Sequence, residues 1–224
     1  TTIFLYNKKF KLISKLSKSH KQIQKSRGHV EHDANEIMKN IFFLVKKISK
    51  KIKYDKNLFL SITNQRETFV IFDKKSGKPL HNAIVWQCRR GQKVCDRINK
   101  SIKNKNLIKK KTGLTLDTYF PAPKLIELLN SNKKIKDKLK NGSALFGTID
   151  TFLIYQLTNQ KIYSTDYTNA SRTLLFDNSS LVWSTDLLKL FKLNIHSLPD
   201  VKESSSIFGY TNFNGILNKN IPIS

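Results

Sequence analysis

Short apolar runs separated by polar breaks occupy the first third of the chain, a pattern typical of β-strands. Residues 3–6 and 10–13 flank the polar stretch Asn7-Lys8-Lys9 and predict a hairpin. Further on, continuous apolar runs without polar alternation indicate strands that are buried on both faces. We predict three such closely spaced strands at residues 58–62, 68–72 and 83–86.

Helical spacing of apolar residues dominates the remainder. The longest helix is expected from Ala34 to about Ile52, because Asp33 and Glu36 form a capping-box-like start. Proline at Pro123 stands at a natural first-turn position of another helix. We predict the remaining helices at residues 89–102, 124–129, 150–157 and 185–191. Strands followed by helices favour an α/β fold.

Length and apolar content are sufficient for a folded domain. The chain has 224 residues, 39% of them apolar, which allows a sizeable core. Neither a membrane-spanning apolar stretch nor a signal peptide is visible. The two cysteines, Cys88 and Cys95, are too few for a disulfide framework and lack the spacing of zinc ligands. We therefore expect no metal site in the chain, no membrane partner and a cytoplasmic location.

Charge is the most unusual feature of the composition. There are 41 Lys and Arg against 16 Asp and Glu, a formal net charge of +25, which first suggests a polyanionic partner. Six of the 41 are arginine, so 35 are lysine. Arginine is the residue that reads guanine edges and grips phosphate in a bidentate fork. Lysine spread among abundant Asn, Ile, Phe and Ser instead indicates an A/T-rich genome, and we expect no specific nucleic-acid partner.

Polar clusters at the ends of predicted strands are the candidates for chemistry. Arg66 can donate to several oxygens in one plane and Glu67 can accept from two hydroxyls, a combination that suits a small polyol. Trp86 could wall a pocket, and the Tyr119 hydroxyl could orient a ligand. Taken singly, Arg66 and Glu67 fit an ordinary polar turn better, and Trp86 fits a core tryptophan better. For Tyr119, a buried aromatic pair that closes a loop is as good an account.

The order of the motifs is more specific than any one of them. Over about residues 28–224 it resembles the glycerol kinases of the FGGY family of carbohydrate kinases. The blocks that carry this resemblance are Val30 to Asp33, Ile62 to Thr68, Asn82 to Arg90, Thr112-Gly113-Leu114 with Tyr119-Phe120, Phe146 to Thr151, Thr165 to Thr173, and Ile221 to Ser224. Four of the six arginines fall inside these blocks, where we expect their geometry to matter.

The resemblance implies a ribonuclease-H-like α/β domain of the actin-like ATPase superfamily, with a mixed sheet flanked by helices. Residues 1–224 would form most of the N-terminal, glycerol-binding domain, truncated at both ends and without the C-terminal domain that closes over the nucleotide. The implied activity is that of an ATP:glycerol 3-phosphotransferase, which uses ATP and Mg²⁺ to convert glycerol to sn-glycerol 3-phosphate in glycerol metabolism. Intact members of the family are often homo-oligomers.

Residue roles follow from the same resemblance. The glycerol contacts would be made by Arg66, Glu67 and Tyr119, with Trp86 as an aromatic wall of the pocket. Thr1 and Thr2 would be what remains of the loop that binds the phosphates of the nucleotide. The aspartate that accepts the proton of the reacting hydroxyl belongs to a Gly-Asp-Gln motif beyond Ser224. We therefore expect no catalytic residue in this chain and no kinase activity from it alone.

Three alternatives stay open. A non-catalytic remnant of a decaying gene would carry the same motifs. Another FGGY sugar kinase would carry a similar fold and prefer a pentose or a longer polyol. A basic nucleic-acid-binding protein would show a steeply salt-dependent affinity for DNA.

Overall fold

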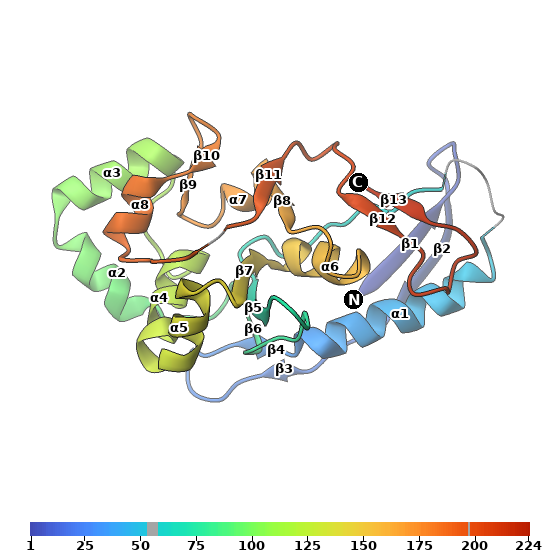
Figure 1. Cartoon of the computed structure of the whole chain (residues 1–224), viewed down its shortest axis with the longest axis horizontal. Coiled ribbons are helices and arrows are strands. Elements are labelled where there is room, and N and C mark those ends of the chain that lie inside the picture. The colour runs from blue at the N-terminus through green and yellow to red at the C-terminus, as the bar shows by residue number, and fades with distance from the viewer. Residues whose placement is uncertain (53–57, 197) are drawn as a thin grey trace.

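The computed structural model describes residues 1–52, 58–196 and 198–224, and a five-stranded sheet lies at its centre (Figure 1). Each pairing in this sheet is antiparallel, and the longest joins β5 to β7 through five residue pairs, from Phe69 opposite Thr148 to Asp73 opposite Ala144. In spatial order the strands are β3 (Gln22–Ile23), β4 (Glu31–His32), β6 (Ala83–Ile84), β5 (Phe69–Asp73) and β7 (Ala144–Thr148).

Both faces of this sheet are covered by apolar side chains. Phe69 and Ile71 belong to one hydrophobic cluster, whereas Val70 and Phe72 belong to a second. All four are at most 1% exposed. Because successive side chains of a strand point to opposite faces, β5 serves both cores at once. The predicted buried strand at residues 68–72 is therefore confirmed.

Helices form a layer on each face of the sheet (Figure 1). The cluster around Phe69 packs against α2 (Gln92–Asn99), α3 (Ile102–Thr112), α4 (Pro121–Ser131), α5 (Lys133–Lys140) and α8 (Thr185–Leu190). The cluster around Phe72 packs against α1 (Ala34–Ser49) and α6 (Ile149–Leu157). None of the helices in the described ranges combines the length and apolar character needed to cross a membrane.

Four two-stranded sheets complete the part of the chain that the structure describes. They are β1 (Thr2–Tyr6) with β2 (Leu12–Ser17), β8 (Ser164–Asp166) with β11 (Asp200–Lys202), β9 (Phe176–Asp177) with β10 (Val182–Trp183), and β12 (Gly209–Thr211) with β13 (Ile221–Ile223). The short helix α7 (Tyr167–Ala170) directly follows β8. The α/β class is confirmed. The parallel pairing that a mixed sheet requires occurs between β8 and β11, outside the five-stranded sheet.

The predicted hairpin and the start of the first long helix are also confirmed. β1 pairs with β2, and the Asp33 side chain caps α1 by accepting a hydrogen bond from the Asn35 backbone N–H at 2.8 Å. Glu36, however, accepts from the backbone N–H of Lys21 at 3.2 Å. A capping box needs that carboxylate to turn back to its own N-cap, so the Asp33 half forms and Glu36 ties the helix to another segment.

The predicted buried strand at residues 58–62 is wrong. Phe59 is 59% exposed, and the run forms a single parallel bridge between Leu60 and Ile223. Leu60 donates its N–H to the carbonyl of Pro222 at 2.9 Å and accepts from Ser224 at 2.7 Å. An apolar run becomes a buried strand only when neighbours cover it, and in the described ranges this run is paired on one side alone.

The helix predicted over residues 89–102 is shorter and is followed by a second helix. α2 ends at Asn99, and Ser101 caps α3 by accepting from the Asn104 N–H at 3.3 Å. Ile102, expected on the buried face, is 71% exposed. Serine competes well for N-cap positions, which explains the break. The lysine-rich helices α3 and α5 were not expected from the sequence, and α4 begins at Pro121, two residues before the proline predicted to open it.

A substitution of Gly91 tests the contact between α2 and the start of α4. A Cβ at Gly91 would lie 2.7 Å from the backbone carbon of Pro123. We expect Gly91→Ala to lower the free energy of unfolding in urea by about 1–3 kcal/mol and to speed amide exchange in the first turn of α4. Gly113→Ala is the control, since its Cβ meets no atom within 4 Å and only its φ of +72° causes strain. Equal amide exchange in the first turn of α4 in both variants would contradict a tight contact between Gly91 and Pro123.

Candidate functional site

Three of the four predicted substrate-contacting residues converge on one end of the central sheet. The rings of Trp86 and Tyr119 meet edge to face with centroids 5.6 Å apart. The guanidinium of Arg172 lies 5.8 Å from the centre of the Tyr119 ring, and its Nε donates to Oε1 of Glu67 at 2.6 Å. We call Glu67, Trp86, Tyr119 and Arg172 the aromatic–carboxylate cluster.

Strand pairing explains why Glu67 and Trp86 are neighbours. β5 begins at Phe69, β6 ends at Ile84, and these two residues pair in antiparallel register. The residues just before β5 and just after β6 therefore leave the sheet at the same edge. The backbone N–H of Trp86 donates to the hydroxyl of Thr68 at 3.3 Å, which fixes this closeness.

Tyr119 is placed by the turn that precedes α4. Its backbone N–H donates to the Asp117 carboxylate at 2.7 Å, and Phe120 is the N-cap residue of α4. Pro121 follows at the first helical position, where its missing N–H costs nothing. Tyr119 is 37% exposed, so its ring lies partly at the surface between Trp86 and Phe120.

Arg172 belongs to the cluster although the sequence analysis did not single it out. It follows α7, and its guanidinium lies 5.0 Å from the centre of the Phe120 ring. Glu67 is only 4% exposed, so its carboxylate needs a charged partner at close range. The hydroxyl of the residue after Arg172, Thr173, donates to the Ala170 carbonyl at 2.7 Å. The signal that could have found Arg172 is the scarcity of arginine, since four of the six arginines lie in the motif blocks.

Lys124 was also missed by the sequence analysis. Its side chain is fully buried at the start of α4, and its Nζ donates to the Tyr119 carbonyl at 2.8 Å. Burial lowers the pKa of Lys124 to about 7. Nothing in the local pattern distinguishes this lysine from the many exposed ones.

The remaining predicted residues lie outside the cluster's contacts. Arg66 is exposed and makes no hydrogen bond or ion pair with another described residue, although it adjoins Glu67 in the chain. Thr1 and Thr2 stand at the start of the β1–β2 hairpin, where the Thr2 hydroxyl lies 3.0 Å from that of Ser17. The structure therefore brings Glu67, Trp86 and Tyr119 together and leaves Thr1 and Thr2 in the hairpin.

A buried polar network lies behind the segment that carries Glu67. Asn64 donates to the side chains of Asn169 at 2.9 Å and Asp150 at 3.4 Å. Asp150 also accepts from the Thr165 hydroxyl at 2.6 Å, and burial raises the pKa of Asp150 to about 6. Asn169 in turn donates to Asp166 at 2.8 Å. These bonds join residue 64, α6 and α7, and so hold the base of the cluster.

A second buried carboxylate anchors the segment after Trp86. Glu31, on β4, accepts from Arg90 at 2.5 Å and from Asn82 at 2.9 Å, with Lys25 at 3.3 Å. Burial alone would raise the pKa of Glu31, but the hydrogen bonds from Arg90 and Asn82 outweigh it and lower this pKa to about 2. Two of the four arginines in the motif blocks, Arg90 and Arg172, thus pair with a buried glutamate.

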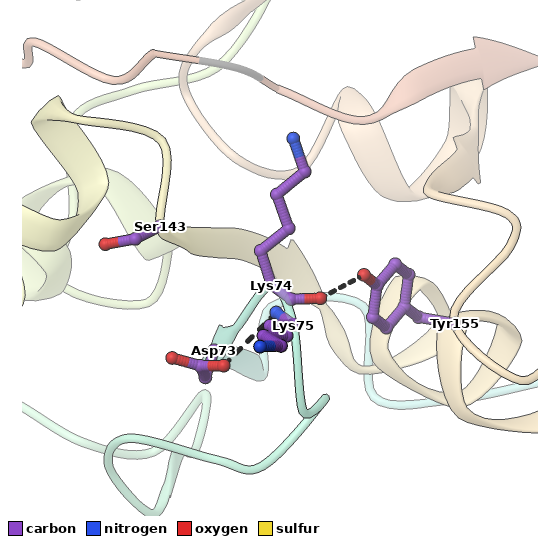
Figure 2. Close-up of a pocket in the computed structure, with 5 residues that line it drawn as sticks. All are labelled: Asp73, Lys74, Lys75, Ser143 and Tyr155. Atoms are coloured by element: carbon purple, nitrogen blue, oxygen red, sulfur yellow. Dashed lines mark hydrogen bonds between the residues drawn. The ribbon is translucent and has the colours of Figure 1, made fainter.

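A surface hollow lies away from the cluster. It has a volume of about 590 Å³, is open to solvent, and lies at the Asp73 end of β5, whereas Glu67 precedes the other end of that strand (Figure 2). Its lining residues are Asp73, Lys74, Lys75, Ser143 and Tyr155. Asp73 already accepts from the Lys75 N–H at 3.1 Å and from Lys138 at 3.1 Å, and Tyr155 donates to the Lys74 carbonyl at 2.6 Å. These bonds occupy the Asp73 carboxylate and the Tyr155 hydroxyl.

Sequence comparison places the chain among carbohydrate kinases. Residues 1–224 match the family model of the FGGY family of carbohydrate kinases, N-terminal domain. Glycerol kinase 1 of Thermotoga maritima is 42% identical, with 100% of this chain and 45% of that protein covered. The glycerol kinase of Thermococcus onnurineus is 47% identical, with 88% of this chain and 39% of that protein covered.

Solved structures show the same relationship. A crystal structure of Plasmodium falciparum glycerol kinase with ADP has a TM-score of 0.91 and 38% identity, covering 100% of this chain and 45% of that one. A gluconate kinase from Lactobacillus acidophilus has a TM-score of 0.86, covering 99% and 44%, but at 21% identity it shows the fold alone. The chain spans less than half the length of these relatives.

Removal of the Arg172 charge tests the pair with Glu67. We expect Arg172→Met to lower the free energy of unfolding by about 2–3 kcal/mol, because a buried carboxylate is left without its partner. The loss should shrink when Glu67→Gln is added, since the uncompensated charge is then gone. Urea unfolding of the two single variants and the double variant gives the coupling energy. Strictly additive losses would show that the two side chains do not interact.

The Glu31 pair should be visible in acid unfolding. Because the pKa of Glu31 is about 2 in the folded chain and about 4.5 when unfolded, its contribution is complete above about pH 4.5 and is lost as the pH falls towards 2. We expect this to amount to roughly 3 kcal/mol of unfolding free energy. Glu31→Gln should flatten the fall between pH 4.5 and 2 relative to wild type. The comparison is needed because Asp73 and Asp177 also have a pKa of about 2. An unchanged slope would exclude the pair as a source of acid sensitivity.

Proposed function

The chain belongs to the FGGY family of carbohydrate kinases, and on this premise we propose that it is most of the N-terminal, glycerol-binding domain of a glycerol kinase. The observation that supports this most directly is the convergence of Glu67, Trp86 and Tyr119 at one sheet edge. Glycerol kinases among the relatives are 37–47% identical to the chain, which favours glycerol over the larger sugars.

The cluster has the chemistry that a small polyol requires. Oε1 of Glu67 is held by Arg172, and Oε2 can accept from substrate hydroxyls. Arg66, exposed beside Glu67, can donate to hydroxyl oxygens from the solvent side. The face of Trp86 suits the C–H surface of glycerol, while the Tyr119 hydroxyl orients another oxygen. Together these groups would hold the terminal hydroxyl in a fixed direction for phosphoryl transfer.

The proposed reaction is transfer of a phosphoryl group from ATP to glycerol, which gives ADP and sn-glycerol 3-phosphate. For the nucleotide side, we propose a phosphate contact at Thr1 and Thr2. In the described ranges no group of three or more His, Cys, Asp or Glu side chains is placed to hold a metal ion. We propose Mg²⁺ as the cofactor of the transfer, with neither its ligands nor the proton acceptor assigned to a residue of this chain. We expect the 224-residue chain alone to transfer no phosphoryl group.

The proposals for cellular location and for assembly rest on fewer observations than the proposal for the substrate. Both cysteines, Cys88 and Cys95, are buried and free, which supports a reducing compartment such as the cytoplasm. Association into homo-oligomers stays a prediction from the family. An FGGY kinase for another sugar is the main alternative, although the likeness to gluconate and xylulose kinases, at 21% identity or less, is one of fold alone. The remnant of a decaying gene also stays open.

Calorimetry with the 224-residue chain tests the substrate. We expect glycerol to bind at least 10-fold more tightly than xylulose or gluconate. Glu67→Gln should weaken glycerol binding about 10-fold or more, because a hydrogen bond to a charged group contributes about 1.5–3 kcal/mol. Lys138→Met, whose partner Asp73 lies at the far end of β5, is the control and should bind as wild type. Preference for the pentose, or glycerol-dependent ADP production by this chain alone, would contradict the proposal.

A further inference from the structure

Lys124 contacts the backbone of every segment that contributes to the aromatic–carboxylate cluster from the sheet and from the turn before α4. Its Nζ donates to the carbonyl of Tyr119 at 2.8 Å, to that of Glu67 at 3.3 Å, and to that of Trp86 at 3.5 Å. The Lys124 Nζ also donates to the Val85 carbonyl at 3.3 Å. Three of these four oxygens belong to the residues whose side chains are proposed to contact the substrate.

We propose that Lys124 is a positioning residue for the substrate pocket: one buried ammonium fixes the backbone of Glu67, Trp86 and Tyr119 relative to one another. The identity of the substrate rests on the proposed function, whereas the positioning itself does not. In its charged form, which predominates below its pKa of about 7, the Lys124 side chain has three N–H donors, which equals the number of segments that supply a carbonyl. It can therefore bond once to the segment before β5, once to the segment after β6 and once to the turn before α4.

The location of Lys124 is unfavourable for a lysine in two respects. It is the fourth residue of α4, near the helix end whose dipole repels a positive charge. Its side chain is also 0% exposed, so the ammonium has lost its hydration. The carbonyl oxygens are what replaces that water. A side chain that merely filled space here would be apolar, like those of Leu125 and Ile126 beside it.

Helix geometry explains how one side chain reaches all three segments. Side chains in an α-helix lean towards the helix N-terminus, and α4 starts immediately after Tyr119 and Phe120. The side chain of Lys124 therefore runs back past the first turn to the sheet edge where β5 starts and β6 ends. Pro121 and Pro123 in that turn stiffen the backbone from which it extends.

Lys124→Met provides the main test, because methionine keeps an unbranched apolar side chain and removes the ammonium. We expect amide exchange to increase at least 10-fold at Thr68, Cys88 and Tyr119 together, one amide from each segment. The β1–β2 hairpin should exchange as in wild type. Lys138→Met is the matched control, since Lys138 pairs with Asp73 at the far end of β5 and should alter none of the three.

A spectroscopic measurement separates positioning from general stability. In a Trp183→Phe background Trp86 is the only tryptophan, and its emission reports its contact with Tyr119. We expect Lys124→Met to raise the quenching of Trp86 by acrylamide at least twofold in the absence of any ligand, and to weaken glycerol binding at least 10-fold. Lys138→Met in the same background should leave both unchanged.

The outcomes distinguish the positioning role from the proposed function. Exchange that rises over the whole chain, or at Tyr119 alone, would overturn the positioning role, as would unaltered exchange and quenching. If Lys124→Met does not fold, Lys124→Gln decides: its shorter amide has two donors, so loosening of one or more of the three segments supports the role and none overturns it. If Lys124→Met loosens the three segments but the wild-type chain does not bind glycerol, the proposed function is contradicted and the positioning role is supported.

Discussion

Glu67 and Lys124 are both almost completely withdrawn from water, and each is stabilised by groups from segments distant in the chain. An uncompensated charge in such surroundings would destabilise the fold by several kcal/mol, so the segments that carry the partners are constrained to meet there. The Trp86–Tyr119 ring contact occurs at the same place. Satisfying buried charge at one sheet edge is thus what assembles the cluster.

The two kinds of basic residue have different tasks in this chain. Arg90 and Arg172 each bind a buried glutamate, and Arg172 also lies over the rings of Tyr119 and Phe120. A planar guanidinium suits such sites because it can bond and stack at once. Most lysines are exposed and account for the bulk of the +25 net charge. Lys124 is the exception, since a compact ammonium fits a ring of carbonyl oxygens.

Local pattern was a good guide to elements whose neighbours are close in sequence or whose caps are strong. The β1–β2 hairpin, the start of α1 at Asp33, and α6 follow the sequence-based expectations. Residues 58–62 failed because an apolar run specifies burial but not a partner strand. The break between α2 and α3 was missed because one capping serine outweighed a continuing apolar period.

The sequence by itself determined the family, the α/β class and the residue types of the site, because short motifs keep their order and spacing along the chain. It also nominated Glu67, Trp86 and Tyr119. Tertiary structure alone decided that these side chains meet, that Arg172 holds Glu67 from 105 residues away, and that Lys124 joins all three segments. Periodicity reports which face of an element is apolar. The partner of a buried charge is set instead by the register of β5 against β6 and by the positions of Lys124 on α4 and of Arg172 after α7.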